Sequence, residues 1–282
     1  MSVRIVADST CDLSKELIEK YDISIIPLCI VMGDKSYYDG IETTPDEIFA
    51  WADANKTTPK TAAVAMDKAA ELLAPFMEAG DDIIFFGISG EMSTTCNVIR
   101  IVGEDKEYDK LFIIDSRNLS TGIGLQVIRA AELAAAGKSA AQIVEAINSV
   151  KDKVRASFVV DTLTYLARGG RCTAVTALLA NTLKLHPQIV VKDGKMGVSK
   201  KYRGSLDSAL NKYVKEMQEE LLQADSARVF ITHSGCSQET LDKVYDSVKA
   251  LNYFEEIHIT RAGGVISSHC GPATLGVLFY EK

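Results

Sequence analysis

Four short, almost continuously apolar segments lie in the first 120 residues, and they limit the possible folds more than any other feature of the sequence. They span residues 3–7, 23–32, 82–89 and 110–116. Strands with this pattern are buried on both faces, which is typical of a parallel sheet covered by helices. We therefore expect an α/β protein whose N-terminal part contains a parallel sheet.

Helix signals separate these segments. Residues 44–47 (TPDE) place an N-cap threonine, a first-turn proline and a capping-box glutamate in the right order, and residues 139–142 (SAAQ) repeat the capping box. Gly80 and Gly137 stand where the helices before them should end. The alternation of strands and helices supports the α/β assignment.

The second half of the chain has a different pattern. Asp193-Gly194 separates two strand-like runs, which is a strong hairpin signal. The expected elements are strands at 158–161, 228–235 and within 255–280, a hairpin at 187–201 and a helix over 205–224. We expect two α/β domains, 1–155 with the parallel sheet and 156–282 with a mixed or antiparallel sheet, the last segment being free to return to the domain interface.

The charge balance argues against nucleic acid as a partner. The chain has 31 Lys and Arg against 38 Asp and Glu, a formal net charge of −7, whereas nucleic-acid binding usually needs a basic field. The six cysteines form no close pair and the four histidines have no metal-ligand spacing. We therefore expect reduced thiols and no metal site.

Nothing in the sequence indicates a membrane segment. The longest strongly apolar stretch, residues 23–32, is interrupted by Pro27, and a spanning helix needs about 20 apolar residues. Arg4 is followed almost at once by Asp8, so no secretory apolar region is present. The expected location is the cytoplasm.

Small polar residues follow three of the N-terminal strands, at residues 8–10 (DST), 89–90 (SG) and 115–116 (DS). In open α/β sheets ligands bind beyond the carboxyl ends of the strands, so these side chains should converge on a crevice. The alternative is that they cap the following helices. Capping alone does not explain the density of hydroxyls at residues 89–95 (SGEMSTT).

Two further clusters are candidates for chemistry. Residues 263–272 combine a glycine pair with Ser, His269 and a Gly-Pro turn, although a lone histidine is more often structural. Residues 168–171 (RGGR) are able to clamp an anion or to end a helix. The phosphate-loop, dinucleotide and G-x-S-x-G motifs are absent. The residues alone therefore lead to a two-part α/β protein with a hydroxyl-rich crevice.

Six short motifs, in order over the whole length, resemble those of the DegV family of bacterial fatty-acid-binding proteins. They are residues 8–13 (DSTCDL), 23–28 with 38–40, 88–97 (ISGEMSTTCN), 115–116 with 120–124, 163–171 (LTYLARGGR) and 269–272 (HCGP). The resemblance implies a two-domain DegV-like fold. It also implies a non-catalytic carrier that binds one long-chain fatty acid, with the acyl chain in the N-terminal domain, and no cofactor.

By the same resemblance, the carrier presents the carboxylate to a separate ATP-dependent fatty acid kinase, whose acyl phosphate feeds phospholipid synthesis. Position by position, Thr61, Ser93 and His269 match the carboxylate-binding residues, and Arg171, Thr94 and Gly170 fall at the site rim or a partner contact. The sequence departs from the family at residues 62–64 (AAV), where Ser-Gln-Pro is usual, and at Thr94, where Gly is usual.

The two ends of a fatty acid need different surroundings. Each buried CH₂ contributes about 0.8 kcal/mol, so the tail needs an apolar lining. Helical apolar residues offer one, although each is equally well explained as ordinary core: Leu72, Leu73, Phe76, Met77, Val98, Ile99, Val127 and Ile128. Two other functions stay open, a Ser-His acyl hydrolase using Ser93 and His269, and a transferase that binds phosphate compounds through residues 168–171.

Overall fold

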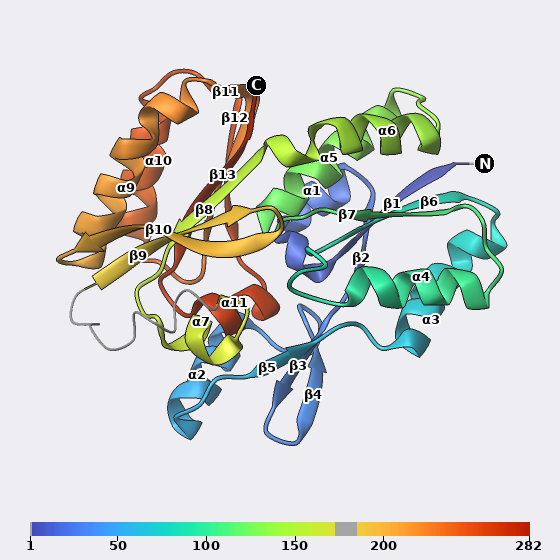
Figure 1. Ribbon diagram of the computed structural model, residues 1–282, viewed down its shortest axis with the longest axis horizontal. Coiled ribbons are helices and arrows are strands. Elements are labelled where there is room, and N and C mark those ends of the chain that lie inside the picture. Colours follow the sequence, from blue (N-terminus) through green and yellow to red (C-terminus); the bar gives the residue numbers. More distant parts are fainter. Residues whose placement is uncertain (1, 173–184) are drawn as a thin grey trace.

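The computed structural model describes residues 2–172 and 185–282, and its N-terminal part is built on a parallel sheet (Figure 1). The strand order is β2-β1-β6-β7, with all neighbours parallel. The bounds are β1 Val3–Asp8, β2 Ile23–Ile26, β6 Asp82–Gly87 and β7 Leu111–Asp115. The predicted buried parallel strands are confirmed.

Helices cover both faces of this sheet, which explains why its strands are apolar throughout. Ile5 and Phe86 pack in one core with α5 (Thr121–Ala135) and α6 (Ala140–Val150). Val6 and Phe85, which are adjacent to Ile5 and Phe86 on the same strands, pack in another core with α3 (Met66–Glu78) and α4 (Thr95–Asp105). Successive side chains of a strand point to opposite faces, so each face has its own apolar layer.

The C-terminal sheet is mixed and has the order β10-β9-β8-β13-β11-β12. β11 and β12 are parallel, and the other pairs are antiparallel. Its strands are β8 Val154–Val159, β9 Leu185–Lys192, β10 Lys195–Arg203, β11 Ala224–His233, β12 Glu256–Arg261 and β13 Leu275–Glu281. The helices α9 (Leu206–Leu221) and α10 (Gln238–Lys249) cover one face, and α5 contacts β8 and β13 as well as β1 and β6. The expected mixed α/β architecture is confirmed.

The predicted strand at 23–32 is wrong in one respect, because the chain breaks at Pro27. β2 ends at Ile26, and the chain resumes as β3 (Cys29–Met32) in a separate antiparallel sheet with β4 (Lys35–Tyr38) and β5 (Lys60–Ala62). Pro27 has no N–H to donate to a ladder, and the N–H of Leu28 bonds to the hydroxyl of Ser9 instead. The strand predicted at 158–161 is β8 (Val154–Val159), which begins earlier and ends at Val159. The prediction missed its start because exposed Arg155 interrupts the apolar run.

The remaining helices are η1 (Ser9–Cys11), α1 (Lys15–Lys20), α2 (Pro45–Asn55), η2 (Lys151–Lys153), α7 (Thr164–Gly169) and α11 (Gly264–Cys270). Among them, α11 contacts β3 and β5 of the small sheet, and α2 and α7 pack against α11. Both predicted capping boxes are present, at the starts of α2 and α6. Gly80 and Gly137 have positive φ just beyond the ends of their helices, as expected. In residues 2–172 and 185–282, no helix combines the length and apolar character needed to cross a bilayer.

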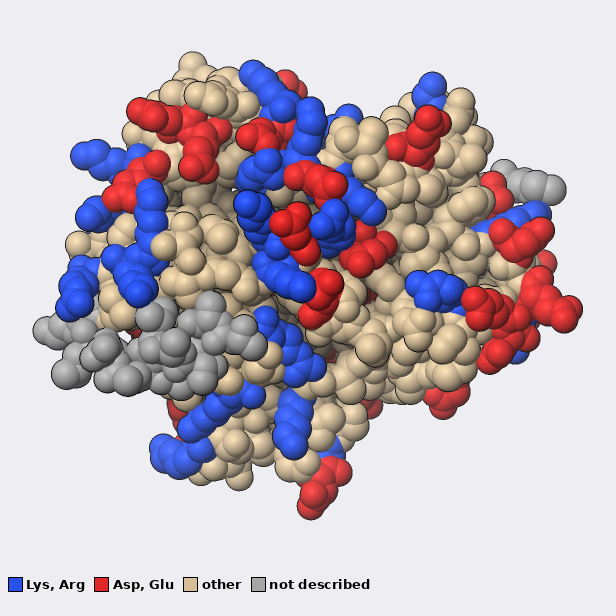
Figure 2. All heavy atoms as spheres, in the orientation of Figure 1, with Lys and Arg blue, Asp and Glu red and all other residues tan. Residues whose placement is uncertain are grey.

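The β9–β10 hairpin reaches from the C-terminal sheet to the strand ends of the parallel sheet (Figure 1). At its tip, the carbonyl of Gly194 accepts a 2.7 Å hydrogen bond from the hydroxyl of Ser89. Arg117 forms ion pairs with Asp193 at 3.3 Å and with Asp152 at 3.1 Å. Charged side chains of both signs interleave across the middle of this face (Figure 2). The hairpin tip is therefore held by hydrogen bonds and ion pairs.

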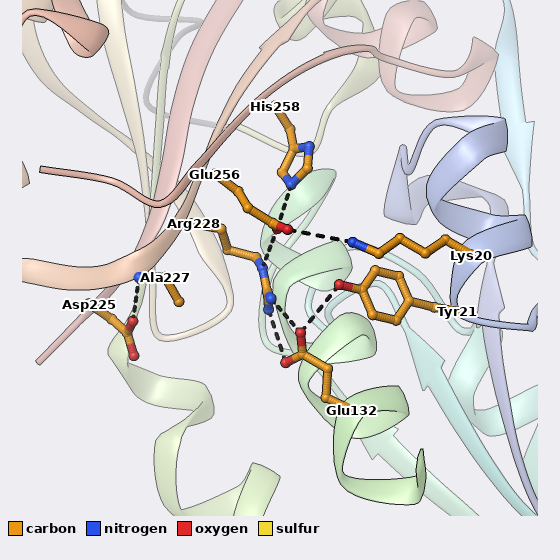
Figure 3. Close-up of polar contacts among 8 residues, drawn as sticks. All are labelled: Lys20, Tyr21, Glu132, Asp225, Ala227, Arg228, Glu256 and His258. Atoms are coloured by element: carbon orange, nitrogen blue, oxygen red, sulfur yellow. Dashed lines mark hydrogen bonds and ion pairs between the residues drawn. The ribbon is translucent and has the colours of Figure 1, made fainter. Parts of the chain in front are cut away.

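A second group of polar contacts joins α1 and α5 to β11 and β12, and we call it the clamp: Lys20, Tyr21, Glu132, Arg228, Glu256 and His258. Figure 3 shows the carboxylate of Glu132 facing the guanidinium of Arg228, with the Tyr21 hydroxyl donating to the same carboxylate at 3.3 Å. Glu256 accepts from Arg228 at 3.4 Å and pairs with Lys20 at 3.5 Å and His258 at 3.0 Å. The clamp thus ties the two main sheets together through charges.

Candidate functional site: an apolar cavity with a polar end

A cavity of about 500 Å³ is lined by segments from both halves of the chain. Most of its surface is apolar, and it includes Leu28, Ile88, Met92, Leu119, Phe158, Leu166, Met196, Val265, Ile266 and Leu278. Met196 comes from the β9–β10 hairpin, and Val265 and Ile266 come from α11. The hairpin and α11 therefore contribute walls that belong to neither face of the parallel sheet.

The polar residues after the parallel strands converge beside this cavity, as expected. The carboxylate of Asp8 accepts the N–H of Ile88 at 2.8 Å, and the carboxylate of Asp115 accepts the N–H of Gly90 at 3.2 Å. Asp8 also caps η1 by accepting the N–H of Thr10. These carboxylates hold the loop that follows β6, so capping and loop support account for them without a ligand.

Thr61 and His269 meet at the cavity wall, and we call this part of the lining the polar end. Other polar residues of the lining are Ser120, Thr232, His233, Ser234 and Thr274. The Thr61 hydroxyl on β5 lies 2.7 Å from Nε2 of His269 on α11, although the two residues are 208 positions apart in the sequence. Nδ1 of His269 is buried and has no hydrogen-bond partner among the described residues. Burial, together with the charge of Arg171, lowers the pKa of His269 to about 4. The imidazole is therefore neutral at physiological pH.

Ser93 and Thr94 line the same cavity from the loop between β6 and α4. The Ser93 hydroxyl lies 2.9 Å from the Thr95 hydroxyl and accepts the N–H of Thr95 at 3.3 Å, so the loop geometry fixes its position. Thr94 is exposed and stands at the N-cap of α4, where its side chain makes no capping hydrogen bond. Both hydroxyls thus border the cavity next to the helix start.

Glycine is required at positions 169 and 170 for two different structural reasons. Gly170 ends α7 in the left-handed conformation at φ +70°, which is the helix-end alternative of the sequence analysis, and it is not among the residues that line the cavity. A β-carbon on Gly169 would lie 2.3 Å from Nδ1 of His269. Only glycine therefore lets α7 approach the imidazole, a role that the sequence analysis missed.

Arg171 lies at the rim of the cavity. Its side chain is exposed, lines the cavity and donates a 2.8 Å hydrogen bond to the carbonyl of Gly169. The guanidinium thus stabilises the end of α7 while its charge stays close enough to lower the pKa of His269. The alternative of an anion clamp between two arginines loses part of its basis, because Arg171 bonds to a carbonyl.

The eight helical residues considered as a tail lining do not line this cavity. Leu73 and Ile99 are fully buried in the core under α3 and α4, and Leu72, Phe76, Met77 and Val98 pack against it. Val127 and Ile128 are fully buried in the core of α5. Ordinary core packing accounts for all eight, and the apolar wall comes from loops, α7, α11, β8, β13 and the β9–β10 hairpin.

The arrangement does not resemble a hydrolase triad. Among the described residues, His269 forms its hydrogen bond with Thr61 rather than Ser93, and no carboxylate contacts its Nδ1. A serine nucleophile needs a base within hydrogen-bond reach and a group that orients the base. No set of three His, Cys, Asp or Glu side chains in the described part is placed to hold a metal ion.

Taken together, these features define a class: an α/β protein with two main sheets and a mostly apolar cavity that is also lined by the hydroxyl of Thr61 and the neutral imidazole of His269. A family model described as an uncharacterised protein of the DegV family matches residues 2–282. A DegV domain-containing protein from Deinococcus radiodurans is 30% identical over 277 residues, which are 98% of each chain. The chain therefore belongs to the DegV family.

Solved structures of the family resemble this fold over the whole chain. The structure described as fatty acid binding of a DegV family protein from Thermus thermophilus has a TM-score of 0.91 at 26% identity and covers 100% of both chains. A stearic acid-binding protein from Eubacterium ventriosum has a TM-score of 0.84 at 27% identity and covers 100% of this chain and 99% of that one.

Proposed function

We propose that this protein binds one long-chain fatty acid in the cavity and presents its carboxylate to a separate ATP-dependent kinase. The observation that carries the proposal is the cavity itself, which is apolar along most of its wall and polar where Thr61 meets His269. Relatives with the same fold bind fatty acids, one of them stearic acid. We also propose a domain division between residues 155 and 156, which falls inside β8.

The apolar wall supplies the affinity. A tail of about 16 carbons contributes on the order of 12 kcal/mol at about 0.8 kcal/mol per CH₂, before the cost of association and ordering. The two methionines in the wall, Met92 and Met196, are unbranched and flexible, so they adapt to the shape of a bound chain. The tail then lies between the two sheets rather than inside the helical cores.

Neutral donors hold the carboxylate. If Nε2–H of His269 donates to the Thr61 oxygen, the Thr61 hydroxyl proton is free to donate to the fatty acid. The opposite tautomer would leave a buried N–H at Nδ1 without an acceptor, which costs more free energy than an unprotonated Nδ1 without a donor. Ser93 supplies a second hydroxyl from the α4 side. A carboxylate held by hydroxyls, without a buried lysine, stays available for phosphorylation.

The first experiment is to extract the purified protein and identify its lipids by mass spectrometry, because a tight carrier is expected to arrive loaded. Thr61→Ala and Ser93→Ala should each weaken palmitate binding about tenfold by removing a hydrogen bond to a charged group. They should also slow phosphorylation by an ATP-dependent fatty acid kinase.

Ser149→Ala is the matched control, since that exposed hydroxyl bonds only within its own helix α6. It should bind palmitate like the parent protein. Unchanged palmitate affinity and unchanged phosphorylation in both cavity variants would remove Thr61 and Ser93 from the site. Absence of any bound or bindable fatty acid would refute the function itself.

A further inference from the structure

The helix that carries His269 lacks a capping side chain of its own. α11 begins at Gly264, and its N-cap residue is Gly263, which has no side chain to accept a hydrogen bond. The first N–H groups of a helix need acceptors, because they have no partner within the helix. Here the acceptors come from the other end of the chain. The N–H of Gly263 donates to Oδ1 of Asp12 at 2.8 Å, and the N–H of Gly264 donates to Oδ1 of Asp39 at 2.7 Å.

The second oxygen of each of these carboxylates accepts a hydrogen bond from a serine hydroxyl. Oδ2 of Asp12 accepts from the Ser120 hydroxyl at 2.5 Å. Oδ2 of Asp39 accepts from the Ser9 hydroxyl at 2.8 Å, and Ser9 in turn accepts the N–H of Leu28. We call Asp12, Asp39, Ser9 and Ser120 the carboxylate cradle. The cradle fixes both oxygens of each aspartate, so the two carboxylates have little freedom to move.

Gly264 is required for this contact, and Gly263 fits it more closely than a larger residue would. A β-carbon on Gly264 would lie 2.6 Å from Cδ1 of Ile30 and 2.8 Å from Oδ1 of Asp39. A β-carbon on Gly263 would lie 3.2 Å from Oδ1 of Asp12. The pair singled out in the sequence therefore lets the helix start enter the cradle, rather than letting a ligand approach the backbone.

Burial of the Asp12 and Asp39 carboxylates costs free energy, which indicates that they have a specific role. Asp12 and Asp39 are 5% and 3% exposed, and neither forms an ion pair with a described Lys or Arg. Burial raises the pKa of both carboxyls, and their hydrogen bonds oppose that rise. Buried charge is tolerated where hydrogen bonds and a helix N-terminus compensate for lost water. General core stability would be served as well by apolar residues.

We propose that Asp12 and Asp39 are positioning residues for the fatty acid head group. They hold the start of α11, and α11 carries His269 to the hydroxyl of Thr61. The same short helix presents Val265, Ile266 and Cys270 to the cavity. The proposal rests on the proposed function, because the head group is the carboxylate that Thr61 and His269 hold.

The test measures head-group recognition separately from tail binding. Delipidated protein is titrated with palmitic acid and with methyl palmitate, which has the same tail and no ionised carboxyl group. Asp39→Ala removes the acceptor for Gly264, so it should reduce the preference for acid over ester about tenfold, as His269→Ala does. Asp39→Asn keeps one acceptor oxygen and should restore most of the preference.

Asp81→Asn is the matched control. Asp81 lies in the N-terminal part and is similarly buried, with 6% of its surface exposed. Its carboxylate accepts hydrogen bonds from the N–H of Ser2 and the guanidinium of Arg4, and it does not line the cavity. This variant should lower stability without changing the acid-to-ester ratio. If Asp39→Ala does not fold, Ser9→Ala loosens Asp39 while leaving its carboxylate in place, and it should lower the ratio by a smaller factor.

The outcomes separate the two proposals. A parent protein that binds acid and ester equally would refute the head-group assignment and the cradle with it. If the parent protein prefers the acid and folded Asp39→Ala or Ser9→Ala has the same acid-to-ester affinity ratio, the role proposed for the cradle is wrong and the head-group assignment stands.

Discussion

Two polar regions of the molecule, the polar end of the cavity and the clamp, have opposite chemistry. At the polar end of the cavity, a hydroxyl meets a neutral imidazole, and buried carboxylates meet backbone N–H groups. At the clamp, Arg228 lies between Glu132 and Glu256, and Lys20 adds a further charge (Figure 3). The first region borders the cavity of about 500 Å³, whereas the clamp residues Glu132 and Arg228 line only a smaller one of about 250 Å³.

The difference separates stability from ligand recognition. Paired charges at the clamp gain most of their interaction within the protein, and Arg228 already has two carboxylate partners. At the polar end of the cavity, Nδ1 of His269 has no hydrogen-bond partner within residues 2–172 and 185–282, and the hydroxyl groups retain hydrogen-bonding capacity. Changes at the cavity should therefore alter binding, and changes at the clamp should alter the free energy of unfolding.

The largest expected effect concerns proton binding by His269. Its pKa lies at about 4 in the folded protein, below the ordinary 6.5, so the folded state holds this proton more weakly than the unfolded state. The stability that the neutral ring contributes is present above pH 6.5 and is lost as the pH falls towards 4. Histidine ring NMR, with His269→Gln for assignment, should show no titration of this ring above about pH 5. Titration near 6.5 would mean that water surrounds the imidazole.

The next effect concerns Gly169. In Gly169→Ala the new methyl group displaces the imidazole from Thr61, because it would otherwise lie 2.3 Å from Nδ1. Loss of that hydrogen bond and its alignment should weaken palmitate binding by about ten- to a hundredfold. Calorimetric titration measures the change. Gly197→Ala is the matched control, since a β-carbon there meets nothing within 4 Å, and equal affinities in both variants would contradict the close-approach role.

The smallest effect belongs to the clamp. The Arg228 side chain is only 13% exposed, so Arg228→Met leaves two carboxylates without their main partner and should lower the free energy of unfolding by about 2 kcal/mol. Lys20 is 55% exposed, and Lys20→Met should cost no more than about 0.5 kcal/mol. Urea unfolding measures both. Palmitate affinity should stay constant, and a selective loss of affinity in Arg228→Met would show that clamp and cavity are coupled.

Much of the fold could be predicted because its signals are local. The capping boxes at Thr44 and Ser139 depend on residues three positions apart, and both are present. The buried strands follow from runs of apolar residues, which need no knowledge of their neighbours. The prediction of one strand at residues 23–32 failed, because this apolar run is divided between two sheets. Pro27 indicates a break in the strand, but it does not indicate which sheet Cys29–Met32 joins.

The candidate site was less predictable from the residues themselves. Helical spacing identifies an apolar face, but it does not distinguish a cavity wall from a core, and Leu73 and Ile99 proved to be core. Met196 reaches the cavity only because a hairpin crosses between the sheets. Gly169 could have been suspected from its place beside Gly170, yet its partner His269 is 100 residues away.

The sequence by itself determined the parallel and mixed sheets, the ends of several helices and the motifs of the DegV family, because each depends on neighbouring residues or on their order. Only the tertiary structure decided that Asp12 and Asp39 support α11 and that Thr61 contacts His269. These contacts join residues more than 200 positions apart. A short-range pattern does not specify such distances, since they are set by how the sheets and helices pack.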